Sequence, residues 1–184
     1  MKKIRPIVVS RHGTGEKWLM SPINELFVVT EHDFGKIVEI CNEPKVYEIL
    51  FQQKLSGKPY SLEQARSFIY WAKEGWENDT HFVFLLRDTD GQIGAAVDIK
   101  SNNLDSSEVG YWATNHKPGI MTNAVLALCQ IARENLYKSL YALVRTDNPK
   151  SIAVLEKVGF KLSTEGLPEK KDGHIYNTYV SSLN

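Results

Sequence analysis

The sequence has little cysteine, and this excludes two common ways of stabilising a small fold. Its 184 residues include two cysteines, Cys41 and Cys129. Two cysteines do not make a disulfide framework, and neither has the spacing of a metal-ligand cluster. Both lie on apolar helical patterns, so we expect buried free thiols and no metal site.

The sequence also lacks an excess of charge and any long apolar run. It has 22 Lys and Arg against 22 Asp and Glu, which gives a formal net charge of zero. This balance argues against a broad basic surface for nucleic acid. The apolar segments are too short for a signal-peptide core or a membrane span. We therefore expect a cytoplasmic protein, a monomer or homodimer, that binds neither nucleic acid nor membrane.

Strand, helix and turn signals alternate along the chain and predict one α+β domain around a mixed sheet. The expected order is β-α-α-β-β-β-α-β-α-β-β. Strands are expected at 26–30, 81–88, 92–100, 107–114, 139–146, 159–166 and 174–182, and helices after the capping boxes at 30–33 and 61–64, at 122–136 and at 149–158. Residues 1–24 form an N-terminal extension, where a hairpin about Gly13-Thr14-Gly15 is possible.

A short polar bend separates a strand from a long helix in GYWATNHKPGIMTNAVLALCQIARENL, residues 110–136. The first amides of a helix point outward without partners and carry the positive end of its dipole, so they attract an anion. Gly119 lets a ligand approach the backbone, and Lys117 can add a charge. A diphosphate suits such a bend, but so does a plain strand-to-helix connection.

A second segment, TDNPKSIAVLEKVGF, has clear helix signals at both ends. Asn148 before Pro149 is typical of an N-cap followed by the first helical residue, and Gly159 ends the helix. Ser151 takes the third helical position. Nothing in the helix itself requires a serine there.

Together these two segments resemble the GNAT superfamily of acyl-CoA-dependent N-acetyltransferases, and within it the ribosomal-protein N-terminal acetyltransferase branch. The likeness covers roughly residues 25–180 and is strongest over 108–160. It implies that residues 25–184 form an acyl-CoA N-acyltransferase domain, with a mostly antiparallel sheet that splays into a V near Trp112 to Thr114, often through a bulge. The sequence departs from the pattern at His116, where the family has Gln or Arg, and at Lys117-Pro118.

By this resemblance the cofactor is acetyl-CoA. Its pantetheine arm would lie along the splayed strand, its pyrophosphate on the helix amides, and its thioester near the start of the last helix. The cofactor-binding residues implied are Trp112, Ala113, Thr114, Lys117, Gly119, Ile120, Met121, Thr122, Asn123, Ala124, Asn148 and Ser151. A backbone N–H near Ala113 would stabilise the oxyanion.

The resemblance also implies direct attack of a primary amine on the thioester in a ternary complex. Glu108 is the candidate base through water, or else an exposed strand carboxylate. Ser151 is the candidate acid, or a helix-capping hydroxyl, and Tyr111 is an acid or a packing residue. Deprotonating an α-amine at pH 7 costs roughly 1 kcal/mol, against about 5 for lysine. This favours a protein N-terminus or a small amine of low pKa.

Two rival interpretations stay open. A catalytically inactive acyl-CoA-binding sensor would keep Gly119 and the helix amides without needing Glu108 or Ser151. Arg11-His12-Gly13 resembles the signature of the histidine phosphatases, although the later histidines lack the pattern of that family.

Overall fold

The computed structural model describes residues 1, 4–165, 168–171 and 173–183. The helices are α1 (Glu31–Cys41), α2 (Pro44–Leu50), α3 (Leu62–Glu77), α4 (Met121–Glu134) and α5 (Pro149–Val158). The strands are β1 (Ile7–Ser10), β2 (Lys17–Pro22), β3 (Phe82–Arg87), β4 (Ile93–Ile99), β5 (Ser107–Ala113), β6 (Ser139–Arg145), β7 (Lys161–Leu162), β8 (Glu169–Lys171) and β9 (His174–Ser182). Among these residues no helix has the length and apolar character needed to cross a membrane.

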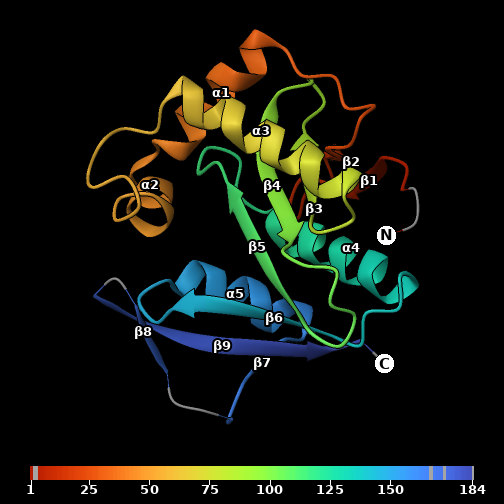
Figure 1. Cartoon of the computed structure of the whole chain (residues 1–184), viewed down its shortest axis with the longest axis vertical. Coiled ribbons are helices and arrows are strands. Elements are labelled where there is room, and N and C mark those ends of the chain that lie inside the picture. Colours follow the sequence, from red (N-terminus) through yellow and green to blue (C-terminus); the bar gives the residue numbers. More distant parts are fainter. Residues whose placement is uncertain (2–3, 166–167, 172, 184) are drawn as a thin grey trace.

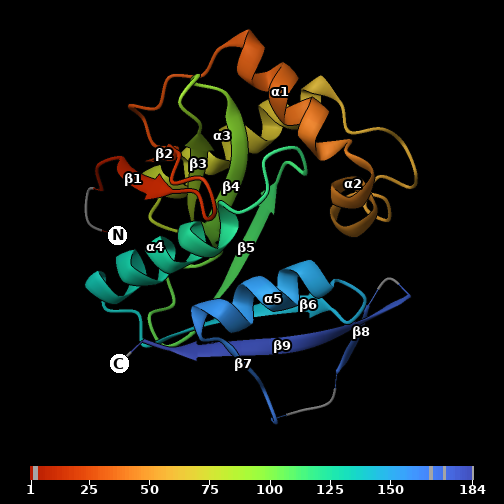
Figure 2. The same cartoon turned by 180° about the vertical axis from the view of Figure 1, so that it is seen from behind.

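One mixed sheet forms the centre of the molecule, as the sequence predicts. Its strand order is β1-β2-β3-β4-β5-β6-β9-β7, with β8 on β9, and β5–β6 is the parallel pair among the described strands. Helices α1 and α3 cover one face of the sheet, and α4 and α5 cover the other (Figures 1 and 2).

The predicted strand at 26–30 is wrong. All five residues are described, and they form a turn and an extended lead into α1. Asn24 makes the turn, because its side chain accepts from Leu26 N and its carbonyl from Phe27 N. Leu26 and Val28 are therefore 71% and 78% exposed despite their high strand propensity.

The possible N-terminal hairpin is present. β1 pairs with β2 from Ile7–Met20 to Ser10–Lys17, and β2 then pairs with β3 in the same sheet. The division of the chain after residue 24 stays a prediction. Of the strand predicted at 159–166, Lys161–Leu162 form β7, and residue 166 lies outside the described residues.

The start and end signals of the helices are confirmed. Thr30 with Asp33, and Ser61 with Gln64, form complete capping boxes at α1 and α3. Gly159 ends α5 at a φ of 98°. Helix α2 was not predicted, since its seven residues are too few to show a helical period.

The sheet splays where β5 and β6 meet. Their parallel pairing covers two residue pairs, Ser107–Leu140 and Glu108–Tyr141, while β5 continues to Ala113 against β4. The V therefore opens after Glu108, earlier than expected. The expected bulge in β5 is also wrong: its register with β4 is unbroken, and the shift lies between Leu86 and Arg87 of β3.

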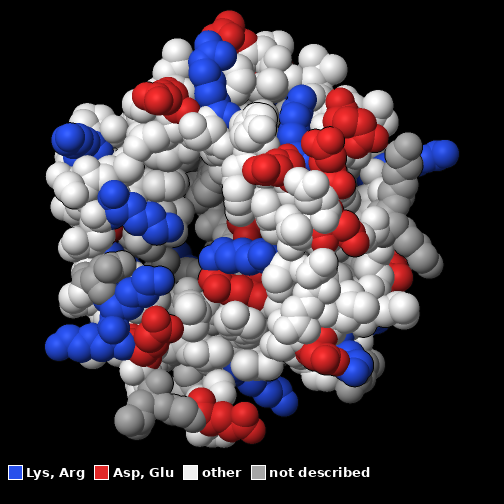
Figure 3. All heavy atoms as spheres, viewed as in Figure 1, with Lys and Arg blue, Asp and Glu red and all other residues white. Residues whose placement is uncertain are grey.

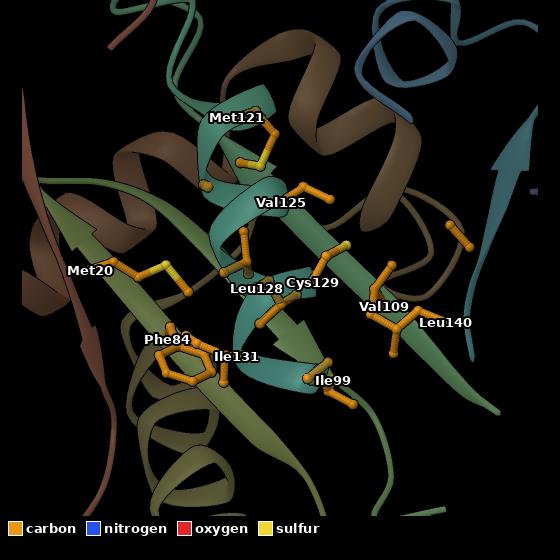
Figure 4. Close-up of a cluster of buried hydrophobic side chains, with 14 of the residues drawn as sticks. Met20, Phe84, Ile99, Val109, Met121, Val125, Leu128, Cys129, Ile131 and Leu140 are labelled. Carbon is orange, nitrogen blue, oxygen red and sulfur yellow. The ribbon is translucent and has the colours of Figure 1, made fainter. Parts of the chain in front are cut away.

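Each face of the sheet has its own apolar core. The larger core lies under α4 (Figure 4) and the smaller under α1 and α3. On β5, Val109 and Tyr111 pack on the α4 side and Trp112 on the other, because successive side chains of a strand point to opposite faces of the sheet. Cys41 and Cys129 are buried free thiols, as predicted, and burial raises their pKa to about 12 and about 11.

Candidate functional site

The bend between β5 and α4 requires glycine at position 119. Gly119 has a φ of 103°, and a Cβ there would lie 2.8 Å from the carbonyl oxygen of His12. Helix α4 has no side-chain cap, and within the described residues the amides of Gly119 to Asn123 donate no hydrogen bond. These are the amides proposed from the sequence to hold an anion, and among the described residues no group accepts a hydrogen bond from them.

The β1–β2 turn holds this bend from one side. Arg11 Nε donates to Pro118 O at 2.8 Å, and His12 N donates to Gly119 O at 3.0 Å. Asn123 Nδ2 donates back to Ser10 O at 2.7 Å. Arg11 and His12 therefore have a structural role in a turn between antiparallel strands, and the phosphatase interpretation of this motif is wrong.

Lys117 holds the bend from another side, and this differs from the role expected for it. Its Nζ donates to Asp88 Oδ2 at 2.5 Å, and this hydrogen bond raises the pKa of Lys117. The Asp88 side chain is buried. The ammonium is therefore committed to a buried carboxylate, which leaves the backbone amides as the main attraction for an anion.

Helix α2 bridges the open end of the V. At its start, Glu43 accepts from Thr114 Oγ1 at 2.5 Å and from Asn115 N at 2.6 Å, both at the end of β5. At its end, Glu48 O accepts from Arg145 NH1 of β6 at 3.2 Å. Arg145 is buried and also forms a two-pronged ion pair with Asp147. The two arms of the V are thus tied to one short helix.

A hydroxyl pair spans the V. Tyr111 of β5 and Ser151 of α5, 40 residues apart in sequence, have their hydroxyl oxygens 2.6 Å apart. Burial raises the pKa of Tyr111 to about 12, against the opposing effect of the Ser151 hydrogen bond. Asn148 accepts from Ser151 N, which confirms it as the N-cap. The two predicted acid candidates therefore form one protonated unit.

The edge of β5 that faces the open V is unpaired beyond its first residues. Lys100 N donates to Glu108 O, and Thr114 N donates to Gly94 O. In an antiparallel ladder with this pattern, the N–H and C=O groups of the even-numbered residues of β5 face β4. Those of the odd-numbered residues face away from β4. The N–H groups of Tyr111 and Ala113 accordingly face the V, where an extended ligand can pair with them.

A carboxylate that the sequence reasoning missed lies on the opposite face of β5. Asp98 of β4 sits beside Gly110, whose missing side chain leaves room for it. Its Oδ1 is buried and has no hydrogen-bond partner among the described residues. Burial raises the pKa of Asp98 to about 6, against the lowering effects of Lys100 and the Gly110 N–H.

Glu108, the base expected from sequence, lies close to Asp98 but is already paired. Its carboxylate accepts a hydrogen bond from Lys100 Nζ. Figure 3 shows basic and acidic side chains meeting beside a hollow in the middle of this face. In the sequence, Asp98 could have been noticed as the one carboxylate in the apolar strand QIGAAVDIK. Its position beside Gly110 becomes known only from the pairing of β4 with β5. Among the described residues no cluster of His, Cys, Asp or Glu is arranged to bind a metal.

Comparison with known proteins agrees with this geometry. Residues 25–161 match the family model of the acetyltransferase (GNAT) domain. Over 147 residues, 75% of its length, the chain is 24% identical to an uncharacterized protein of Methanocaldococcus jannaschii and spans 28% of that protein.

Two solved structures share the fold. Mycobacterium smegmatis RimJ in complex with a CoA-disulfide superposes with a TM-score of 0.72 at 19% identity, over 97% of this chain and 90% of that one. Vibrio cholerae spermidine N-acetyltransferase in complex with CoA and spermine gives 0.68 at 14% identity, over 90% and 95%. The family match covers most of the sequence, and the chain belongs to the GNAT acetyltransferase family.

Proposed function

We propose that the protein is an acetyl-CoA-dependent N-acetyltransferase that moves the acetyl group to a primary amine. The observation that carries this proposal is the row of open amides at the start of α4, next to the unpaired edge of β5. A diphosphate fits the first feature and the amides of a pantetheine arm fit the second. Both solved relatives described above contain CoA.

The acyl group would lie at the end of β5, between the acid pair and the acceptor side. The Ala113 N–H, which faces the V, would donate to the carbonyl oxygen and stabilise the oxyanion of the tetrahedral intermediate. The amine nitrogen attacks the thioester carbon, the C–S bond breaks, and the thiolate takes a proton from the Tyr111–Ser151 pair. Tyr111 stays protonated near neutral pH, so it can donate.

The proton that leaves the amine goes to Asp98, directly or through one water. Asp98 is favoured over Glu108 because its Oδ1 has no partner, whereas Glu108 is bound to Lys100. With a pKa of about 6, Asp98 is largely ionised at pH 7 and is a stronger base than an ordinary carboxylate. Glu108 then acts on Asp98 through its charge.

Two measurements test the proposal. Calorimetric titration with CoA is expected to show binding, and release of free thiol from acetyl-CoA is expected in the presence of an amine. Ser151→Ala is expected to lower turnover about tenfold or more while CoA still binds, because the Tyr111 phenol loses its partner. Tight CoA binding with no acetylated product from any amine or short peptide would instead identify an acyl-CoA sensor, and absence of CoA binding would refute both functions.

A further inference from the structure

Half-buried apolar side chains lie on the side of the sheet to which Asp98 of β4 points, at the margin of the smaller core. Phe51 and Leu55 follow α2, Phe68 comes from α3, and Trp112 comes from β5. All four pack at the margin of the core under α1 and α3, each with part of its surface exposed. The rings of Phe68 and Trp112 lie 6.2 Å apart, centre to centre. We call the space between these residues and Asp98 the acceptor hollow.

Hydrogen bonds fix the shape of the acceptor hollow. Glu43 and Arg145 tie α2 to β5 and β6, and Phe51 follows directly after this anchored helix. Figure 3 shows a hollow near the middle of this face of the molecule, and in the same view α2 and β5 lie on either side of that place (Figure 1). A hollow lined by rings and held open in this way is suited to a flat or bulky apolar group.

The charges around the hollow limit how many ammonium groups it can hold. Glu108 is paired with Lys100, Glu43 with the end of β5, and Asp147 with Arg145. The Asp98 side chain is half-buried and makes no ion pair among the described residues, and the charge of Lys54 also acts on it. The hollow therefore offers a place for one amine, whereas a polyamine would bring further ammonium groups next to lysines.

We infer, given the function proposed above, that the acceptor is an α-amine next to an aromatic or large apolar side chain. The amine lies at Asp98 and the side chain packs against Phe68 and Trp112. An α-amino group has a pKa of about 7.7–8.0 against about 10.4 for an alkylamine such as lysine. Asp98, at about 6, is closer to the α-amine and takes its proton more readily.

The experiment compares acceptors with wild-type protein and acetyl-CoA. Phenylalaninamide is expected to give a kcat/KM at least about tenfold above alaninamide and spermidine, because burying one large apolar group contributes that much selectivity. It should also exceed phenethylamine, which has the same ring but an alkylamine of higher pKa. Free phenylalanine and a phenylalanine-initiated dipeptide are compared last, to tell an amino acid from a protein N-terminus. Preference for alaninamide or spermidine would overturn the inference.

Variants locate the selectivity within the hollow. Phe68→Ala is expected to reduce the preference for phenylalaninamide over alaninamide at least about fivefold, with CoA affinity unchanged. Phe68→Leu, which keeps the core filled, should reduce it less. Tyr70→Ala changes an exposed aromatic residue on the same helix and should leave the preference as in wild type. An unchanged preference in Phe68→Ala would show that the side chain binds elsewhere.

Direct binding separates failure of this inference from failure of the proposed function. Phenylalaninamide is titrated into protein saturated with CoA, with spermidine as the comparison. Phenylalaninamide binding that is lost in Phe68→Ala supports the hollow as an apolar amine site even where no acetyl group is transferred. No phenylalaninamide binding by a protein that acetylates other amines refutes the inference alone.

Discussion

The cofactor side and the acceptor side of β5 differ in how their polar groups are matched. On the cofactor side, Arg11, His12 and Lys117 hold the bend before α4 by hydrogen bonds and an ion pair. On the acceptor side, Asp98 Oδ1 is buried without a partner and several apolar rings are half exposed. A preformed site suits a ligand that is the same in every reaction cycle, whereas a buried polar group without a partner is the expected place for the proposed proton transfer.

The largest expected effect is on the unmatched side. Asp98→Asn removes the proposed base while keeping shape, so kcat/KM is expected to fall about 10²–10³-fold. In wild type, kcat/KM should rise with pH through about 6 as Asp98 ionises, and this limb should be absent from the variant. Glu108→Gln is the matched control and should cost less than about tenfold. If Glu108→Gln costs more than Asp98→Asn, the roles of the two carboxylates are reversed.

The same variant should gain stability. The folded-state pKa of Asp98, about 6, lies above its ordinary value of 3.8, so the folded protein binds this proton more tightly than the unfolded chain does. Ionised Asp98 therefore costs the folded state about 1–3 kcal/mol above pH 6, and the cost fades as pH falls towards 4. Urea unfolding is expected to find Asp98→Asn more stable at pH 8 and equal to wild type at pH 4. A variant less stable at pH 8 would contradict the assigned burial.

The next largest effect is expected from a change in the bend before α4, on the side where the polar groups are paired. Gly119→Ala places a Cβ against the His12 carbonyl and strains a positive φ, so the bend must shift. The dissociation constant for CoA is expected to rise at least about tenfold, since a shift of about 1 Å spoils several amide contacts together. Gly13→Ala has a similar φ with nothing within 4 Å and serves as the control. Equal losses in both variants would mean that backbone strain alone is responsible.

The smallest expected effect on CoA binding comes from Lys117. Because its ammonium is held by Asp88, Lys117→Met should change the dissociation constant for CoA less than about threefold. It should instead lower the free energy of unfolding by about 1–3 kcal/mol, because buried Asp88 loses its cation. Isothermal titration and urea unfolding of one preparation measure both quantities. A large loss of CoA affinity without loss of stability would instead indicate that Lys117 contacts the phosphates of CoA.

Local signals were sufficient for much of the fold and for part of the site. The capping boxes at Thr30 and Ser61 and the N-cap at Asn148 depend on residues within a few positions of one another. The need for Gly119 also depends on the distant His12 carbonyl. Propensity failed at 26–30, where the turn at Asn24 overrides a run of strand-forming residues.

The rest of the site depends on contacts between distant segments. Asp98 is a candidate base because β4 pairs it with Gly110, and Lys117 is occupied because Asp88 lies 29 positions earlier in the chain. The hydrogen bond from Thr114 to Glu43 joins residues 71 positions apart. Neither hydrophobic periodicity nor a short sequence motif encodes contacts between such distant residues, so the three-dimensional structure is needed to find them.

The two residue pairs that join β5 to β6 act as a pivot for the whole V. From Glu108 to Ala113, where β5 is paired with β4 but not with β6, the strand is about 17 Å long at about 3.3 Å per residue. A rotation of about 5° at the pivot then moves the far tip by about 1.5 Å, and a misplacement of about 1 Å is enough to cost about 10²-fold in rate. Conservative changes at Ser107 or Leu140 can therefore change the rate, because a small change of angle at this junction is enlarged at the far end of β5.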